Sequence, residues 1–408
     1  MIMKEFFALP KQIQIREGFK FLTAMLGNTI FPFMALYYSH YFGNFWTGIL
    51  LIVTQLVNFV STLYGGHLTD SLGRKKVTDF GNLGVCLGFV MVVLANIPHH
   101  VFPLLTFWGF LVVEAMHHFS QPAYEAMLID LTDESNRKFV YTISYWLVNI
   151  AVMLGAGLAG LFYESHFFEL VLAMALLYLL IFYYMWKHFE ETQPTDAIFS
   201  HGTGVWDIFQ NYGDILKDRV FLMYVAGCVG SACIWLQIDT WLPIHYAQNF
   251  QVTSLFGVTI TGPKMLSLSV FINTFMIVFL MTHVSKWTKK LPVLPQYIIG
   301  FLTFATGIFL AMQFRTLLGI ALAAVLYTIG EMLQVPASQL LRIEMMDEDK
   351  LGSYSGFLAL AQPLGNILAG MMVSLTALTG PLGLQISFLI IVEISLSMII
   401  KAEKLHRK

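Results

Sequence analysis

Long apolar stretches alternate with short polar segments along the whole chain. Each stretch is longer than a soluble core helix needs and suits a helix of about 20 residues that crosses a bilayer. Charged residues, prolines and polar clusters separate the stretches. The pattern predicts twelve membrane-spanning helices, near residues 18–41, 46–68, 77–97, 103–128, 139–162, 167–187, 219–243, 257–283, 294–313, 317–341, 353–376 and 382–400.

The composition indicates a polytopic membrane protein. Of the 408 residues, 57% are hydrophobic and 12% are charged, whereas about 25% are charged in a soluble globular protein. This argues against a soluble enzyme, a nucleic-acid-binding protein and a disordered protein. Twelve helices leave 34 residues for each helix and its loop (408/12), which is too few for an extramembrane domain.

The distribution of basic residues predicts the orientation, because cytoplasmic loops carry an excess of Lys and Arg. With a cytoplasmic N-terminus, only Lys264 and Arg315 of the 23 basic residues fall outside the inner segments and the inner mouth of the first helix. An incorrect number of helices would place the basic loops on both sides of the membrane. We therefore expect a multi-pass protein of the cell membrane with both termini in the cytoplasm.

A polar segment and an internal repeat divide the chain into halves. The predicted organisation is an N-terminal six-helix bundle (1–187), a cytoplasmic linker (188–218) and a C-terminal six-helix bundle (219–408). Five positions recur at an offset of 214 residues. They match Pro122, Ala123, Asp130, Asp133 and Glu134 with Pro336, Ala337, Glu344, Asp347 and Glu348. Two parallel six-helix repeats are the organisation of major facilitator transporters.

The loop after the second predicted helix carries a motif of glycines and charges. It reads Gly65-Gly66-His67-Leu68-Thr69-Asp70-Ser71-Leu72-Gly73-Arg74-Lys75-Lys76. The loop resembles the G-x-x-x-D-R-x-G-R-[RK] signature of the major facilitator superfamily, with Ser71 in place of the usual Arg. The resemblance implies a conformational network in which Asp70 meets the N-terminal end of the eleventh helix, at Gly352 and Ser353, and Asp130 also takes part. The remaining members of the network are Gly66, Gly73, Arg74 and Lys75.

Further segments extend the resemblance along nearly the whole chain. They are Ile129-Asp130 with Asn136-Arg137-Lys138, Gln237-Ile238-Asp239 with Leu242-Pro243-Ile244-His245, Tyr327-Thr328-Ile329-Gly330-Glu331 with Pro336, and Gly352-Ser353-Tyr354. They are similar to the LmrP-type proton-coupled multidrug antiporters of the superfamily. By position, Asp239 and Glu331 correspond to acids tied to cation recognition and proton coupling. Ser144 stands where the compared family member has an acid, so the proton stoichiometry does not carry over.

Ionisable residues at membrane depth are costly and mark candidate sites. In the fourth helix Glu114, His118, Gln121 and Glu125 follow a spacing that places them on one face. This stripe predicts either a proton relay through Glu114 or Glu125, or an interhelical hydrogen-bonded seam. His117 and His118 are either titrating groups or satisfied core donors. A metal site is not expected, because adjacent histidines on a helix point about 100° apart.

Asp239 and Glu331 each lie in an otherwise apolar helix. Low dielectric disfavours a carboxylate and favours its protonated form, whereas a bound lipophilic cation favours the charged form. A proton and a cation therefore compete for one charge, which is the minimal chemistry of exchange. Lys264 either pairs with one of these acids or extends its ammonium group to the membrane interface.

The sequence thus predicts an all-α membrane protein with the major facilitator fold that exports lipophilic, often cationic drugs in exchange for protons by alternating access. Its expected partners are lipophilic small molecules, protons and membrane lipids, without nucleic acid, cofactor or metal, and the expected state is a monomer. A symporter or a lipid flippase for one solute is the alternative. An enzyme is disfavoured because no nucleophile–base, metal or P-loop motif occurs.

Overall fold

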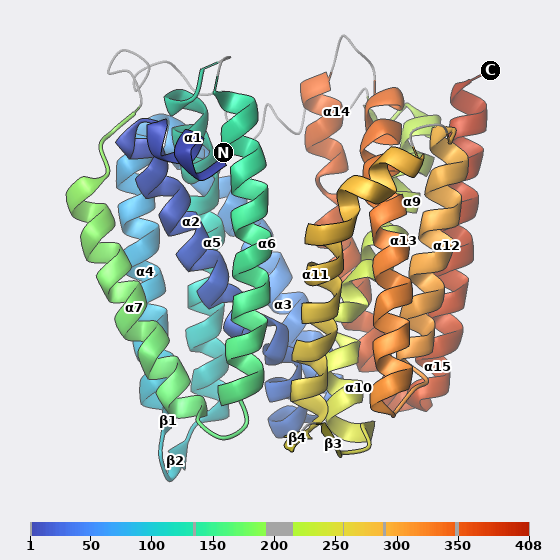
Figure 1. The fold of residues 1–408 in the computed structure, drawn as a ribbon, viewed down its shortest axis with the longest axis horizontal. Helices are drawn as coiled ribbons and strands as arrows, with labels where there is room; N and C mark the ends of the chain where they lie inside the picture. The colour runs from blue at the N-terminus through green and yellow to red at the C-terminus, as the bar shows by residue number, and fades with distance from the viewer. Residues whose placement is uncertain are drawn as a thin grey trace. The chain divides into compact units, whose positions relative to one another are not determined.

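The computed structural model of the chain is built almost entirely of helices (Figure 1). It describes residues 2–133, 136–192, 215–255, 257–288, 291–346 and 351–407. Within these residues, nine helical stretches are long and apolar enough to cross a membrane. The chain is therefore a multi-pass membrane protein, and the number of twelve crossings stays a prediction.

The helices of the first half are α1 (Ile2–Ala8), α2 (Lys11–Ile30), η1 (Phe31–Phe33), α3 (Met34–Leu72), α4 (Arg74–Ala95), α5 (Pro103–Leu131), α6 (Arg137–Phe162) and α7 (Phe167–His188). Those of the second half are α9 (Arg219–Trp235), η3 (Leu236–Ile238), α10 (Trp241–Asn249), α11 (Gly262–Thr288), α12 (Val293–Ala311), α13 (Leu317–Glu344), α14 (Leu351–Leu358) and α15 (Ala361–His406).

Two glycines interrupt the longest helical stretches. Gly43 in α3 has φ 75° and Gly380 in α15 has φ 68°, and both backbones are non-helical there. This left-handed region suits glycine because it has no Cβ atom. Each glycine lies where the sequence predicts a loop between two spans, so one non-helical residue takes the place of a longer connection.

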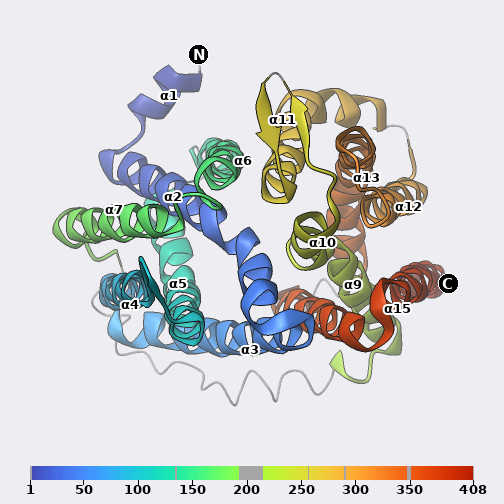
Figure 2. The same cartoon turned by 90° about the horizontal axis from the view of Figure 1, so that it is seen from below.

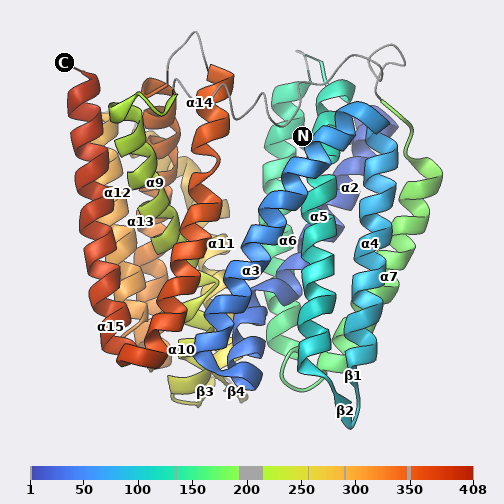
Figure 3. The same ribbon diagram turned by 180° about the vertical axis from the view of Figure 1, so that it is seen from behind.

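Two short antiparallel hairpins lie between helices, where the sequence predicts only helices and loops. One pairs β1 (Asn96–Ile97) with β2 (His100–Val101) between α4 and α5 (Figure 3). The other pairs β3 (Thr253–Leu255) with β4 (Val258–Ile260) before α11. The helix predicted to start at residue 257 therefore starts at Gly262, because the apolar residues of β4 belong to a hairpin.

The chain forms two compact units, each of which is described by itself. Unit 1 comprises Met1–Ile30 and Val53–Val205, and unit 2 comprises Phe31–Ile52 and Trp206–Lys408. The segment 31–52 belongs to the predicted first bundle but packs within unit 2. There the Ser374 hydroxyl donates to the Phe45 carbonyl oxygen at 2.9 Å. The predicted division at residues 188–218 stays a prediction, and residues 193–214 lie outside those described.

Pairs of helices pack closely in both units. In unit 1, α4 packs against α5 and α7, and α2 packs against α6; in unit 2, α12 packs against α13, and α9 against α15 (Figure 2). Gly84 and Gly88 of α4 face α5 so closely that a Cβ atom would meet Met116 at the first and Gly109 and Val113 at the second. The absence of side chains at these two glycines therefore allows α4 and α5 to approach closely.

Proline positions support the internal repeat. Pro122 lies inside α5 and Pro336 lies inside α13. Each proline comes nineteen positions after the first residue of its helix, from 103 to 122 and from 317 to 336. Both helices continue past the proline, so the matched residues occupy equivalent places in two similar helices.

A large side chain at Gly307 of α12 should destabilise unit 2. A Cβ atom there would meet the backbone of Tyr327 on α13, and backbone cannot move aside as a flexible side chain does. We expect Gly307→Leu to cost about 1–3 kcal/mol through overpacking and to lower the midpoint of thermal unfolding in detergent. Gly157→Leu in α6 is the matched control, because nothing lies within 4 Å of its Cβ position. Equal midpoints for the two variants would contradict the close contact.

Candidate functional site

Asp239 lies at an interruption between two helices. α9 ends at Trp235, one 3₁₀ turn covers Leu236–Ile238, and α10 begins at Trp241. The Leu236 carbonyl oxygen accepts from the amide nitrogens of Asp239 and Thr240 at 3.1 and 3.0 Å. Irregular backbone at membrane depth occurs where it is buried in protein or faces water. Because α10 begins at Trp241, the half-buried Asp239 carboxyl group lies just before a helix N-terminus, where the helix dipole favours negative charge.

Glu331 on α13 is held by an amide from another helix. Asn273 Nδ2 on α11 donates to Glu331 Oε2 at 2.7 Å and also to Thr328 Oγ1 at 3.2 Å. The side chain of Trp235, at the end of α9, also acts electrostatically on this carboxyl group. The Asn273 amide of α11 thus orients the Glu331 carboxyl group of α13.

The two acids of unit 2 belong to one cluster. Asp239 interacts electrostatically with Glu331, and the buried Tyr327 interacts with both. Tyr327 lies one helical turn before Glu331 on α13. Among the residues that the structure describes, no hydrogen-bond donor reaches the Asp239 carboxylate, so it differs from Glu331 in having an unoccupied acceptor group.

Unit 1 contains a matching pair of an asparagine and a glutamate. Asn58 Nδ2 on α3 donates to Glu114 Oε2 on α5 at 2.9 Å. The Asn58 side chain is buried, and its Oδ1 has no hydrogen-bond partner within the described ranges. α5 and α13 are the two proline-containing helices of the repeat, so each unit holds the acid of its repeat helix with an asparagine from another helix.

The polar residues that the spacing groups on α5 contact one another in two pairs. His118 Nε2 lies 3.7 Å from Glu114 Oε2, an ion pair only when the imidazole is protonated. Gln121 Nε2 donates to Glu125 Oε1 at 3.4 Å, near the helix end, where both side chains are exposed. Glu114 therefore combines a partner on its own helix with one on α3, whereas Glu125 contacts its own helix.

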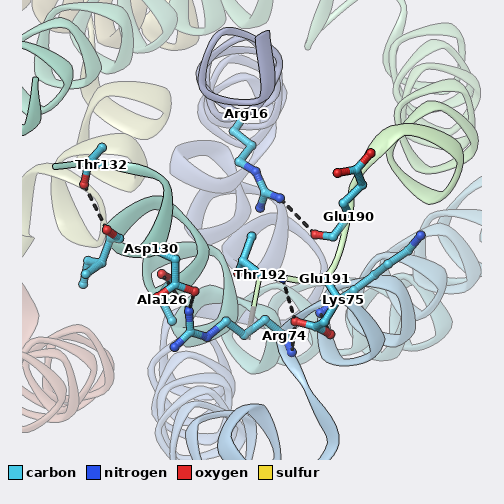
Figure 4. A network of polar contacts seen from close by, with 10 residues as sticks. Arg16, Arg74, Lys75, Ala126, Asp130, Thr132, Glu190, Glu191 and Thr192 are labelled. Atoms are coloured by element: carbon cyan, nitrogen blue, oxygen red, sulfur yellow. Dashed lines mark hydrogen bonds and ion pairs between the residues drawn. The ribbon is translucent and has the colours of Figure 1, made fainter. Parts of the chain in front are cut away.

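The motif loop connects α3 to α4 through Gly73. This residue has φ 95°, a conformation that favours glycine. Arg74 forms an ion pair with Asp130 near the end of α5 and donates from Nη1 to the Ala126 carbonyl oxygen at 3.3 Å (Figure 4). Gly66 lies against Pro122 of α5. The predicted contact of Asp70 with residues 352–353 involves side chains outside those that the structure describes.

Comparison with known proteins identifies the family of the chain. The sequence profile of the Major Facilitator Superfamily matches residues 19–370. The chain belongs to the major facilitator superfamily. It is therefore a transporter and not an enzyme, and its substrates are small molecules. Members of this family usually work as monomers.

Relatives of this transporter differ in what they carry. A Na(+), Li(+), K(+)/H(+) antiporter of Planococcus maritimus is 26% identical over 366 residues, which are 86% of each chain. Multidrug resistance protein MdtH of Edwardsiella ictaluri is 23% identical over 345 residues, covering 83% of this chain and 80% of that protein. Both relatives span most of their own length in the match.

Solved structures of other transporters share the fold. A nucleoside transporter, NupG, has a TM-score of 0.75 at 10% identity and covers 97% of this chain and 99% of its own. A POT family transporter in complex with 5-aminolevulinic acid has a TM-score of 0.71 at 14% identity, covering 96% of this chain and 95% of its own. The similarity concerns the architecture of the helices.

Glu191 contacts the motif loop although no sequence motif marks it. Its carboxylate accepts from the backbone N–H groups of Arg74 and Lys75 at 3.1 and 3.0 Å (Figure 4). These N–H groups begin α4 and have no partner within their own helix. Glu191 thus caps α4 from the segment that follows α7. An acidic pair after a helix is too common to reveal such a contact.

The same segment is also held by α2. Arg16 Nη2 donates to the Glu190 carbonyl oxygen at 3.2 Å, and Gln12 Nε2 donates to the His188 carbonyl oxygen at 3.2 Å. The Arg16 guanidinium lies 4.3 Å from the centre of the Phe189 ring. Residues 188–192 therefore connect the ends of α2, α4 and α7 within unit 1.

Lys264 has a partner outside the acidic cluster. Its Nζ donates to the Thr259 carbonyl oxygen in β4 at 2.9 Å. No ion pair joins it to Asp239 or Glu331 in the part of the chain that the structure describes. The Lys264 ammonium group thus supports the hairpin before α11.

Removing the Glu191 carboxylate should destabilise unit 1. Loss of a helix N-cap costs about 0.5–2 kcal/mol, so Glu191→Ala should lower the midpoint of thermal unfolding, and Glu191→Gln should lie between it and the parent. Glu190→Ala is the matched control, because Glu190 accepts from Arg16 through its backbone carbonyl. A Glu190→Ala variant as unstable as Glu191→Ala would rule out the capping role.

Proposed function

We propose that this transporter is a proton-coupled antiporter that exports lipophilic, often cationic small molecules by alternating access. The cluster of Asp239 and Glu331 carries the proposal. Two carboxyl groups from α13 and from the break between α9 and α10 interact within one unit. Such a pair can hold a proton or a positively charged cargo, which are the two ligands of an exchanger.

The two acids have different roles in the proposed cycle. Asp239, without a hydrogen-bond donor among the described residues, is the charge that attracts the cation. Glu331 already accepts from Asn273, so it supplies a second, oriented charge when the cargo is dicationic. Proton binding from outside neutralises the carboxyl groups and releases the cargo, and proton loss inward restores the cation site.

The paired arrangement in unit 1 supports a contribution from Glu114. Like Glu331, it accepts an asparagine amide from another helix, and His118 lies 3.7 Å away. Glu114 and His118 together offer a group that loses charge and a group that gains charge on protonation. We propose that this pair takes part in proton coupling, and that Glu125 lies at the end of the same route.

A second candidate function is exchange of protons for alkali metal cations. Gln237 is completely buried two residues before Asp239, and its Oε1 has no hydrogen-bond partner within the described residues. Carboxylate, amide and backbone oxygens at an interrupted helix are suitable ligands for Na⁺. The Na(+), Li(+), K(+)/H(+) antiporter relative favours this candidate.

Neutral variants of the two acids test the proposal. We expect Asp239→Asn and Glu331→Gln each to reduce export of a dicationic dye from energised cells by about tenfold or more. A hydrogen bond or contact to a charged group contributes about 1.5–3 kcal/mol, and each 1.4 kcal/mol is about tenfold. Export of a monocationic dye should fall less, because one carboxylate remains.

Glu393→Gln is the matched control for these variants, since Glu393 is an exposed acid on α15. It should export both dyes at the parent rate when expressed at the same level. Normal export of dications by both Asp239→Asn and Glu331→Gln would show that the site assignment is wrong.

Everted membrane vesicles separate the two cargo classes. When a respiring vesicle has an acidic lumen, addition of a transported cation releases protons and restores the fluorescence of a pH-sensitive dye. We expect a lipophilic dication to do so, and Asp239→Asn to abolish the response. If Na⁺ or K⁺ restores fluorescence and Gln237→Leu removes only that response, the alkali cation candidate is the better one.

The proposed antiporter also has an expected membrane location and orientation. We infer that the protein lies in the cell membrane as a monomer with both termini in the cytoplasm, as the basic residues indicate. Competition among several unrelated dyes for pH-dependent efflux is expected for a multidrug exporter. Dependence on one solute without such competition would favour a symporter or a lipid flippase.

A further inference from the structure

A buried carboxyl group lies near the start of α2, outside the acids discussed above. The side chain of Glu17 is 1% exposed, and its Oε2 has no hydrogen-bond partner among the described residues. A buried polar atom without a partner is costly, and a buried charge more so. Glu17 therefore resembles neither a solvated surface acid nor a fully paired structural one.

A hydroxyl group connects Glu17 to the surface of unit 1. Lys20, one helical turn further along α2, is exposed and donates from Nζ to Ser144 Oγ on α6 at 2.7 Å. The Ser144 side chain is buried and lies near enough to the Glu17 carboxyl group to act on it electrostatically. Because the hydroxyl accepts from the ammonium group, its own hydrogen is available for the carboxylate.

Among the described residues, one cation acts on Glu17. The neighbouring Arg16 points its guanidinium toward Phe189 and the Glu190 carbonyl oxygen. Among the described residues, the main helix contacts of α2 are with α6, α5 and α7. Their groups at this part of α2 are Tyr124 of α5, which interacts with Arg16, Ser144 of α6, and Tyr178 of α7, whose hydroxyl donates to the Thr23 carbonyl oxygen at 3.4 Å. Within the described residues, Lys20 is thus the cation that acts on Glu17.

We propose that Glu17, Ser144 and Lys20 form a second proton-binding site, located in unit 1. The proton binds to the Glu17 carboxylate and neutralises it, so the unpartnered oxygen becomes a hydroxyl or an uncharged carbonyl. The proton reaches Glu17 through Ser144, because the Ser144 hydroxyl accepts from the exposed Lys20 ammonium group and acts on the buried carboxyl group. Lys20 passes a proton to the Ser144 oxygen as the hydroxyl hydrogen moves to Glu17, and Lys20 then regains a proton from the surrounding water.

Infrared difference spectroscopy of the purified full-length protein in lipid tests the site directly. Spectra between acidic and neutral pH show the carbonyl stretching band of carboxyl groups that take up a proton. We expect Glu17→Gln to lose the contribution of one carboxyl group from this band. Glu169→Gln, which changes an exposed acid in the first turn of α7, should keep the parent band in the same pH range.

Two further variants keep the carboxyl group and test its connections. Removing the hydroxyl in Ser144→Ala or the charge in Lys20→Met weakens the support of the carboxylate. Each should move the pH midpoint of the Glu17 contribution upward, and Ser144→Ala should also slow proton uptake after a pH jump. An unchanged band in Glu17→Gln overturns the proposal. If Glu17→Gln does not fold, unchanged midpoints in both other variants overturn it.

The link to transport rests on the proposed antiport, but the proton-binding site does not. If Glu17→Gln loses its band while the parent exchanges no cation for protons, the antiport proposal fails and the site stands. If the parent exchanges cations for protons and Glu17→Gln keeps both the band and the exchange rate, the site fails and the antiport proposal stands.

Discussion

Polar groups inside a bilayer have to find their partners within the protein, because lipid tails offer none. This constraint accounts for the helices and for the way the acids are held. Asn58 donates to Glu114 in unit 1, and Asn273 donates to Glu331 in unit 2. Each amide comes from a different helix than its acid. The same contact therefore joins two helices and orients a carboxyl group.

The constraint also explains why the interruption between α9 and α10 is informative. A break in a transmembrane helix takes backbone groups away from their usual partners, and after Trp235 the Leu236 carbonyl oxygen accepts from the amides of Asp239 and Thr240 in a 3₁₀ turn. A charged acid at such a point is costly unless a partner or a proton compensates it. Asp239 stands there, and Glu331 lies close enough for their charges to interact. The proposed competition follows from the cost of keeping two carboxylates charged in low dielectric, because either a proton or a cation lowers that cost.

At the ends of its helices, unit 1 is held by contacts of another kind. Glu191 caps α4, Arg74 pairs with Asp130, and Arg16 holds the segment after α7. These groups connect helix ends rather than helix middles. They therefore fix the ends of α2, α4, α5 and α7 relative to one another within unit 1. The proposed site at Glu17 lies one residue from Arg16, on the same helix.

Local properties of the sequence were enough to predict the helical membrane fold and several candidate acids. An apolar stretch of bilayer length forms a helix whatever its neighbours are, and Asp239 and Glu331 stand out because each charge interrupts such a stretch. The structure also supports the repeat that pairs Pro122 with Pro336, because the two prolines lie at the same place in α5 and α13. The family resemblance added the motif loop, where Arg74 and Asp130 pair.

Tertiary structure alone decided which helices supply the partners. The amides of Asn58 and Asn273, the cap by Glu191 and the burial of Glu17 leave no mark in a local pattern, because each depends on residues that are distant in the chain. The residues of the β3–β4 hairpin are apolar enough to be taken for the start of a helix. Residues 31–52 belong to the first half of the chain but pack within unit 2. Hydrophobicity thus determines that a segment enters the membrane, whereas complementary shape and hydrogen bonding between helices determine what each polar group meets there.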